Sequence, residues 1–207
     1  MPYIPPADRP ALDAAVDALA ETIAEDMQNG NETSRISTRL RAAFLRIAGA
    51  IREAEAGKAP VPDGDAAELA RRILEAAAGA DVEAGWVGAL NYALTRLIQA
   101  VPDRMVERGA WDQRLRYWIY AQTAGALNRT AWDLHRECGD GPVGNGLCGV
   151  FIDVKDEYKR RVNTAYEAAQ ILKNGDCYDR APFRTRLVHV DVGGVAGCQE
   201  VMLVDKG

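Results

Sequence analysis

Residues 147–172 read LCGVFIDVKDEYKRRVNTAYEAAQIL and give the chain its clearest structural signal. Apolar and small side chains recur there at steps of three and four, at Leu147, Phe151, Val154, Tyr158, Val162, Ala165, Ala169 and Leu172. This spacing predicts one amphipathic helix of about 40 Å, with a continuous apolar stripe. Asn174-Gly175 is expected to end the helix, because both residues tolerate a left-handed backbone.

The same period upstream predicts a bundle of helices. Their expected ranges are about 8–27, 34–56, 65–78, 86–101 and 111–138. Pro102 is expected to end the fourth helix. The run Gly141-Pro142-Val143-Gly144-Asn145-Gly146 is expected to break the chain before Leu147. One short internal echo is present, because Gly88-Ala89-Leu90-Asn91 recurs as Gly125-Ala126-Leu127-Asn128; four residues do not establish a duplication.

After Pro182 the apolar period changes from helical to two. Leu187, Val188, Val190 and Val192 precede Gly193-Gly194, and a second apolar run follows Gly197. This pattern predicts a β-hairpin. The predicted fold class is therefore mainly α, a helical bundle with a long C-terminal amphipathic helix and an appended C-terminal β-hairpin. Residues 1–180 are expected to form one helical domain and residues 183–207 the hairpin extension.

Composition restricts the function classes. The chain has 207 residues and a net charge of −5, which argues against a nucleic-acid binder. It contains no run of about 18 apolar residues and no basic region followed by an apolar core, so we expect no membrane span, no secretory signal and a cytoplasmic location. The four cysteines form no C-x-x-C pair, so thiols are expected rather than a metal site.

Three blocks of sequence carry a resemblance. They are Met1-Pro2-Tyr3-Ile4-Pro5 with Arg9 and Leu12-Asp13, residues 88–97 (GALNYALTRL), and a block from Gly149-Val150-Phe151 to Asn174-Gly175-Asp176-Cys177-Tyr178. Together they resemble a family of small helical proteins of unknown function that is common in phage genomes and in bacteria carrying prophage. The resemblance skips residues 31–80, which it implies to be a helical insertion. Asn163-Thr164-Ala165 stands where the family approaches Tyr166-Glu167 through a proline, so the helix is expected to be unbroken here.

The polar residues of these blocks are the candidate ligand-binding set. Arginine offers a planar fork for phosphate or carboxylate, tyrosine a stacking face, and asparagine a donor and an acceptor. Such a set suits a small anionic, nucleotide-like molecule. The alternative is structural, because Asp13 with Arg96 and Glu157 with Arg161 also fit ion pairs that fix helix register. The candidate residues are Tyr3, Arg9, Asn91, Tyr92, Arg96, Arg160, Arg161, Tyr166, Asn174, Asp176 and Tyr178.

Catalytic patterns are sparse. The two histidines are His135 and His189, and Arg129-x5-His135 has a spacing used by helical ribonucleases. No Gly-x-Ser-x-Gly, P-loop or Glu-x-x-His pattern occurs, so no metal and no cofactor are expected.

The leading hypothesis is a non-enzymatic, phage-type accessory protein that binds, and in a phage setting sequesters, a small anionic nucleotide-like ligand. The first alternative is an interaction or structural protein that binds a host or virion protein. The second is a ribonuclease that uses Arg129 and His135. The long apolar stripe and the hairpin edge favour a homo-oligomer over a monomer.

Overall fold

The computed structural model describes residues 4–7, 9–28, 36–58, 64–79, 85–109, 116–138, 141–164, 167–169, 172, 184–192 and 195–203. The chain divides into two compact units, Met1–Asn163 and Thr164–Gly207, and each is described by itself.

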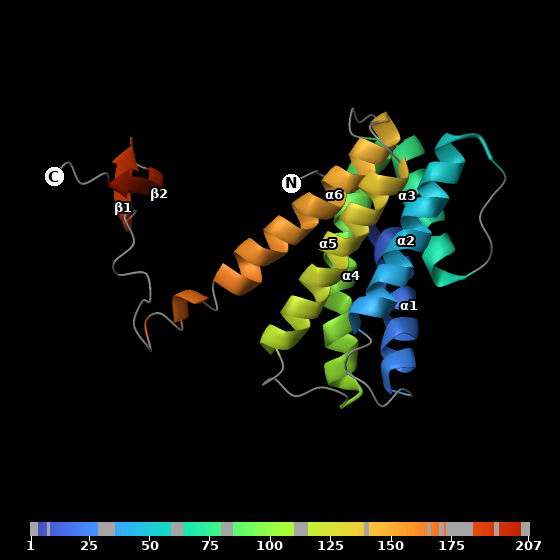
Figure 1. Ribbon diagram of the computed structural model, residues 1–207, viewed down its shortest axis with the longest axis horizontal. Coiled ribbons are helices and arrows are strands. Elements are labelled where there is room, and N and C mark those ends of the chain that lie inside the picture. The colour runs from blue at the N-terminus through green and yellow to red at the C-terminus, as the bar shows by residue number, and fades with distance from the viewer. Residues whose placement is uncertain are drawn as a thin grey trace. The chain divides into compact units, whose positions relative to one another are not determined.

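The first unit is a bundle of helices, which confirms the mainly α fold class (Figure 1). The helices pack around one core, in which the rings of Phe44 and Phe151 meet edge to face at 5.4 Å between centroids. Their bounds are α1 (Arg9–Gln28), α2 (Ile36–Glu55), α3 (Asp65–Gly79), α4 (Gly85–Glu107), α5 (Arg116–Cys138), α6 (Pro142–Tyr158) and the π-helical turn η3 (Lys159–Asn163).

Two pairs of helices in the bundle run in the same direction. Asp13 and Glu25 of α1 pair with Arg96 and Arg108 of α4, in that order, so α1 and α4 are parallel. In the second pair, Arg41 of α2 contacts Asp133 of α5, while Arg52 contacts Glu137 one turn later on α5. The helices α2 and α5 are therefore parallel as well, and α6 packs against α5.

The segment predicted to be an insertion contributes to this core. Leu40, Phe44 and Ile47 of α2 and Leu69 and Ile73 of α3 are each fully buried. Burying such side chains stabilises a fold by roughly 1.5–3 kcal/mol each, so α2 and α3 are part of the bundle. That residues 31–80 are a helical insertion stays a prediction.

The prediction that Pro102 ends its helix is wrong. The helix α4 continues through Pro102 to Glu107, with Val101 and Met105 buried on either side of the proline. Proline removes one backbone hydrogen bond and disfavours the helix interior. Burial of Met105 and the contacts of Arg104 with α1 offset that loss.

The glycine-rich run was predicted to break the helix before Leu147. A new helix does begin within the run, because α5 ends at Cys138, but it begins earlier than predicted. The helix α6 begins at Pro142, with Gly141 in an extended conformation before it. Proline suits the first turn of a helix, where its missing N–H would have no partner. A Cβ atom at Gly146 would lie 3.2 Å from the Trp86 ring, so the glycine allows α6 to approach α4 closely.

The apolar stripe is buried over a shorter length than predicted. Leu147, Phe151 and Val154 are buried, but α6 ends at Tyr158 and η3 follows. A π-helical turn takes an extra residue per turn and rotates the following side chains away from the packed face. Val162 is accordingly 40% exposed, so the buried part of the stripe ends before it. The continuation of the helix to Leu172 lies partly outside the described residues and stays a prediction.

In the second unit, β1 (Arg184–Val192) and β2 (Val195–Leu203) pair in antiparallel orientation. Arg184 lies opposite Leu203 at one end, and Val192 lies opposite Val195 at the other. That this hairpin is a stable extension of the fold stays a prediction, because an isolated two-stranded ribbon is marginal in water.

Candidate functional site

Four residues from two of the blocks meet where α1 packs on α4. The Tyr92 hydroxyl donates to the two carboxylate oxygens of Asp13 at 3.0 and 3.2 Å, and Arg96 Nε lies 3.2 Å from the same carboxylate. The Arg9 guanidinium lies over the Tyr92 ring, 5.9 Å from its centroid, and Arg9 Nε donates to the Ile4 carbonyl. Burial and the Asp13 carboxylate raise the pKa of Tyr92.

This cluster is the first in a series of ion pairs between α1 and α4. Arg104 lies 3.6 Å from both Asp17 and Glu21, and Arg108 binds Glu21 and Glu25. Acidic residues recur every fourth position on α1, so they follow one stripe that faces the arginines of α4. The ion pair of Asp13 with Arg96 is confirmed, and that it fixes helix register stays a prediction.

A second candidate group lies after α6. Arg160 donates to Glu157 at 2.8 Å through both Nε and Nη2, and Arg161 Nε binds the same carboxylate. Hydrogen bonds from Arg160, and then from Arg161, lower the pKa of Glu157 to about 2. The interpretation of Glu157 and Arg161 as an ion pair is likewise confirmed. Both guanidinium groups are engaged by a local carboxylate.

The remaining predicted ligand residues are placed as follows. Asn91 is half-buried on α4, directly before Tyr92. The others lie outside the described residues, and the structure does not test them; they are Tyr3, Tyr166, Asn174, Asp176 and Tyr178.

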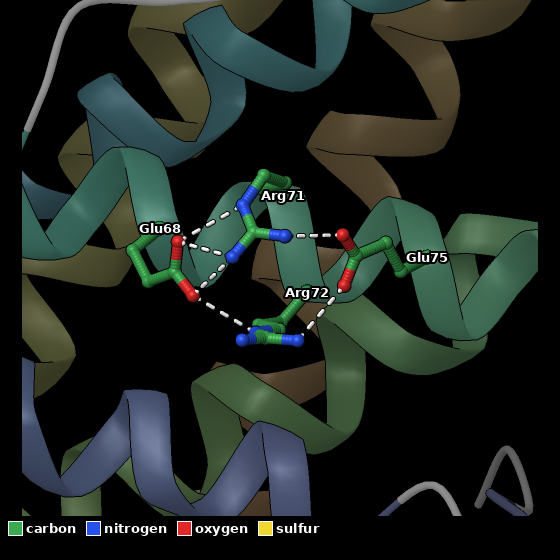
Figure 2. Close-up of polar contacts among 4 residues, drawn as sticks. All are labelled: Glu68, Arg71, Arg72 and Glu75. Carbon is green, nitrogen blue, oxygen red and sulfur yellow. Dashed lines mark hydrogen bonds and ion pairs between the residues drawn. The ribbon is translucent and has the colours of Figure 1, made fainter.

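A further charge cluster covers the outer face of α3 (Figure 2). Arg71 and Arg72 both bridge Glu68 and Glu75, with Nε donating to Glu68 at 2.9 Å and 2.8 Å respectively. The hydrogen bond from Arg71 lowers the pKa of Glu68. Two cations and two anions neutralise one another within a single helix, so the cluster offers no net charge to a ligand.

The best candidate site is a groove of about 650 Å³ among α2, α5 and α6. Its volume falls within the range of roughly 300–1,000 Å³ that small-ligand sites occupy. The groove residues are Arg41, Asn128, Arg129, Ala131, Trp132, Asp133, His135, Cys148, Ile152 and Lys155.

The groove is lined by an exposed aromatic side chain, that of Trp132. The Trp132 side chain is 67% exposed on the polar face of α5, and Ile152 of α6 is 40% exposed. The ring of His135 lies 6.5 Å from the Trp132 ring between centroids, at an interplanar angle of 48°. Trp132 is large, planar and not needed to fill the core, so it suits stacking against a planar ligand.

The cations of the groove differ in their partners. Arg41 donates to Asp133 at 2.8 Å and 2.6 Å, and Lys155 Nζ lies 3.2 Å from Asp156. Arg129 Nη2 instead donates to the hydroxyl of buried Ser37 at 2.7 Å. The Ser37 contact orients the guanidinium without neutralising it, so Arg129 keeps its charge for a ligand.

The sequence prediction found part of this site. Arg129 and His135, proposed for the ribonuclease, both line the groove. Trp132, Asn128, Arg41 and Lys155 were missed as site residues. A detectable signal existed, since Trp132 lies between Arg129 and His135 on the face of α5 that the apolar period leaves to solvent.

The described residues contain no group of three or more His, Cys, Asp or Glu side chains that could hold a metal ion. Of the helices with described bounds, none is long and apolar enough to cross a membrane.

These features define a class: a helical bundle whose parallel helix pairs are joined by ion pairs, with a mixed polar and aromatic groove on one side. The chain belongs to a family described as a domain of unknown function (DUF6899), whose family model matches residues 1–140. The match includes residues 31–80 and ends before the third block of the resemblance. No curated protein and no solved structure matches the chain.

Proposed function

We propose that the protein binds a small anionic molecule with a planar ring, a nucleotide-like ligand, in the groove among α2, α5 and α6. The observation that carries the proposal is the exposed Trp132 ring, one helical turn from an arginine whose partner is neutral. Residues three apart on a helix lie on the same face. The ring would stack on Trp132 while the anionic group binds Arg129.

The groove supports this proposal better than the cluster of Arg9, Asp13, Tyr92 and Arg96 does. A phosphate at Arg96 would compete with the Asp13 carboxylate and would meet its negative charge. The same holds for Arg160 and Arg161, which both bind Glu157. We therefore propose the same ligand class as the sequence suggested, at different residues.

Binding is tested by native mass spectrometry of the full chain, alone and with a panel of linear and cyclic nucleotides. We expect nucleotide mass to be gained at one molecule per chain, and Trp132→Ala to remove the gain while leaving the helical circular dichroism unchanged. Tyr92→Phe is the control, because it removes the hydroxyl of an aromatic side chain at the α1–α4 contact, outside the groove, and should leave the gain of mass unchanged. A panel that adds no mass to the wild-type chain would contradict the proposal.

A second candidate function is RNA cleavage, because Arg129 and His135 line the same groove. His135 would take the proton from a 2′-hydroxyl as that oxygen attacks the phosphorus, and Arg129 would stabilise the charge on the phosphate. The P–O5′ bond would break, giving a 2′,3′-cyclic phosphate and a 5′-hydroxyl that receives a proton from His135 or water. In a cleavage assay on single-stranded RNA, this candidate requires that His135→Ala abolish activity. Cleavage that persists in that variant, or is absent from the wild type, excludes it.

We propose in addition that the chain self-associates through its C-terminal third. The support is the exposure of Val162 and Leu172, together with the outer edges of β1 and β2, which no other described strand pairs and which favour pairing with another strand. Completion of the long amphipathic helix and stabilisation of the hairpin would then accompany assembly. Light scattering after size exclusion tests this: Leu172→Asp should lower the mass, and a wild-type monomer would contradict it.

The alternative of a protein partner remains a proposal of a different class. In the phage setting that the sequence resemblance suggests, the partner would be a host or virion protein, and the nucleotide binder would sequester a host signalling nucleotide. A chain that binds no nucleotide but loses partner binding when residues 183–207 are removed would favour the protein partner.

A further inference from the structure

We infer that the groove selects ligands with a single phosphate, the nucleoside monophosphates, over nucleoside triphosphates and cyclic dinucleotides. The inference rests on the proposed function and specifies the ligand of that same groove. It follows from the charges around the groove rather than from the volume, which suits larger ligands too.

The first step is the balance of charge. Arg41 is matched by Asp133, which is 8% exposed and lies in the groove, and Lys155 is matched by Asp156. Arg129 is held by the Ser37 hydroxyl, which carries no charge. The groove therefore presents one guanidinium whose charge is not already balanced.

The second step is what additional phosphates would meet. Asp133 follows Trp132 directly and lines the groove together with Arg41. To gain a cation in the groove, a β- or γ-phosphate would have to compete with Asp133 for Arg41 or with Asp156 for Lys155, and would meet the negative charge of that carboxylate. Like charges brought together in a partly desolvated site repel, and such juxtaposition is a common source of specificity.

The third step is the orientation of the bound group. The Ser37 contact uses one N–H of Arg129 at 2.7 Å and leaves the other donors for a bidentate bond to one phosphate. Asn128 and Trp132 lie four residues apart on α5, so the Asn128 amide can reach the edge of a ring stacked on Trp132. Ring, amide and guanidinium then bind three parts of one nucleoside monophosphate.

The test is isothermal titration calorimetry with the full chain. The ligands are the 5′-monophosphates of adenosine, guanosine, cytidine and uridine, and the nucleoside, triphosphate and cyclic dinucleotide of the base that binds best. We expect the monophosphate to bind at least about tenfold more tightly than the nucleoside, as for a charge-assisted bidentate bond. It should also bind more tightly than the triphosphate and the cyclic dinucleotide.

Two variants make the test specific. Arg129→Gln should reduce monophosphate affinity to that of the nucleoside, and Arg46→Gln, an exposed arginine of α2 outside the groove, should leave it unchanged. Asp156→Asn releases Lys155 and should improve triphosphate binding relative to monophosphate by about two- to fivefold. Asp156 is 64% exposed in its side chain, so this variant is not expected to unfold.

The outcomes separate this inference from the proposed function. If the triphosphate or the cyclic dinucleotide binds more tightly than the monophosphate, the single-phosphate inference is wrong while the proposed function stands. If Arg129→Gln leaves monophosphate affinity unchanged, the inference is wrong as well. If no nucleotide binds at all, both are wrong.

Discussion

Arg41 and Asp133 join α2 to α5 in the same way that Asp13 and Arg96 join α1 to α4, but with the charges exchanged. Arg96 and Asp133 each stand eight residues after the first glycine of a Gly-Ala-Leu-Asn sequence, at Gly88 and Gly125. The short sequence echo thus marks equivalent positions in two parallel helix pairs. Because the charges are exchanged, packing α1 on α5 would bring Asp13 to Asp133, and packing α2 on α4 would bring Arg41 to Arg96. These like charges disfavour the wrong pairing of helices.

Breaking the Arg41–Asp133 pair should destabilise the protein more than losing a surface ion pair does. The Asp133 side chain is only 11% exposed, so Arg41→Met leaves a poorly solvated carboxylate without its main partner. We expect the free energy of unfolding in urea to fall by about 2 kcal/mol, because Arg41 is itself half-exposed and Arg136 lies 3.8 Å from the same carboxylate.

Two further variants test whether the loss of stability comes from the ion pair. The double variant Arg41→Asp with Asp133→Arg should recover part of the lost stability, whereas Arg46→Met, on the exposed face of α2, should change it by less than about 0.5 kcal/mol. A loss from Arg41→Met no larger than that of the control would contradict the interpretation.

Tyr92 and Asp13 should be energetically coupled across the α1–α4 contact. The tyrosine hydroxyl donates to a carboxylate that also binds Arg96, so Tyr92→Phe and Asp13→Ala remove the same interaction. A double-mutant cycle on the free energy of unfolding should give a coupling of about 1 kcal/mol. Asp103, exposed on the same helix α4, provides the reference, and a cycle of Tyr92→Phe with Asp103→Ala should show no coupling.

Acid should weaken the end of α6 through Glu157. Arg160 and Arg161 lower the pKa of Glu157 to about 2, below its ordinary value of 4.5. The depressed pKa means that the stabilisation is complete above about pH 4.5 and is lost as the pH falls through 2. The difference in melting temperature between the wild type and Glu157→Gln should therefore shrink between pH 5 and pH 2. A difference that stays constant over this range would exclude a role for the carboxylate charge.

Alkali should act on Tyr158, whose pKa is raised by burial to about 12. A raised pKa means that the contribution to stability is complete below about pH 10 and is lost as the pH rises through 12. In an ultraviolet titration of tyrosinate, the difference between the wild type and Tyr158→Phe should show one group that ionises near pH 12. Ionisation of that group near pH 10 would show that the ring is solvated.

A chain that ends after Asn163 should fold. In the part of the chain that the structure describes, every buried apolar residue of the core cluster lies between Ile4 and Val154, within the first compact unit. We expect the shortened chain to keep a cooperative thermal transition, with a midpoint within a few degrees of the full chain. The control ends before Lys155 and removes Tyr158 and the last turn of α6; it should melt at a lower temperature. Loss of cooperative unfolding in the longer fragment would show that the first unit depends on the second.

Periodicity predicted the helices of the bundle and their buried faces, because α-helical spacing depends only on local sequence. Leu12, Val16, Leu19 and Ile23 are buried along α1 as the pattern indicates. The errors fall where tertiary contacts override local preference. Pro102 remains inside α4 because the residues after it are buried and paired with α1, and Gly146 is helical because Trp86 packs against it.

For the candidate site, too, the sequence indicated the residue types, and only tertiary contacts showed their partners. The residue types of the three blocks suggested a ligand and, as the alternative, ion pairs of Asp13 with Arg96 and of Glu157 with Arg161. The sequence did not decide between the two, and the structure shows that both arginines have these carboxylate partners. Conversely, Arg129 and His135 drew notice only as a spacing, while the groove around them also depends on Arg41 and Lys155, which come from other helices. Convergence of residues far apart in the chain cannot be read from their spacing along it.

The sequence by itself determined that this is a helical protein, which faces of its helices are apolar, and which residues carry charge. The tertiary structure decided which charges neutralise one another and which have a neutral partner. The physical reason is that an arginine acts as a binding residue or a structural one according to its partner. Asp13 satisfies Arg96 from another helix, whereas Ser37 holds Arg129 and leaves its charge in place.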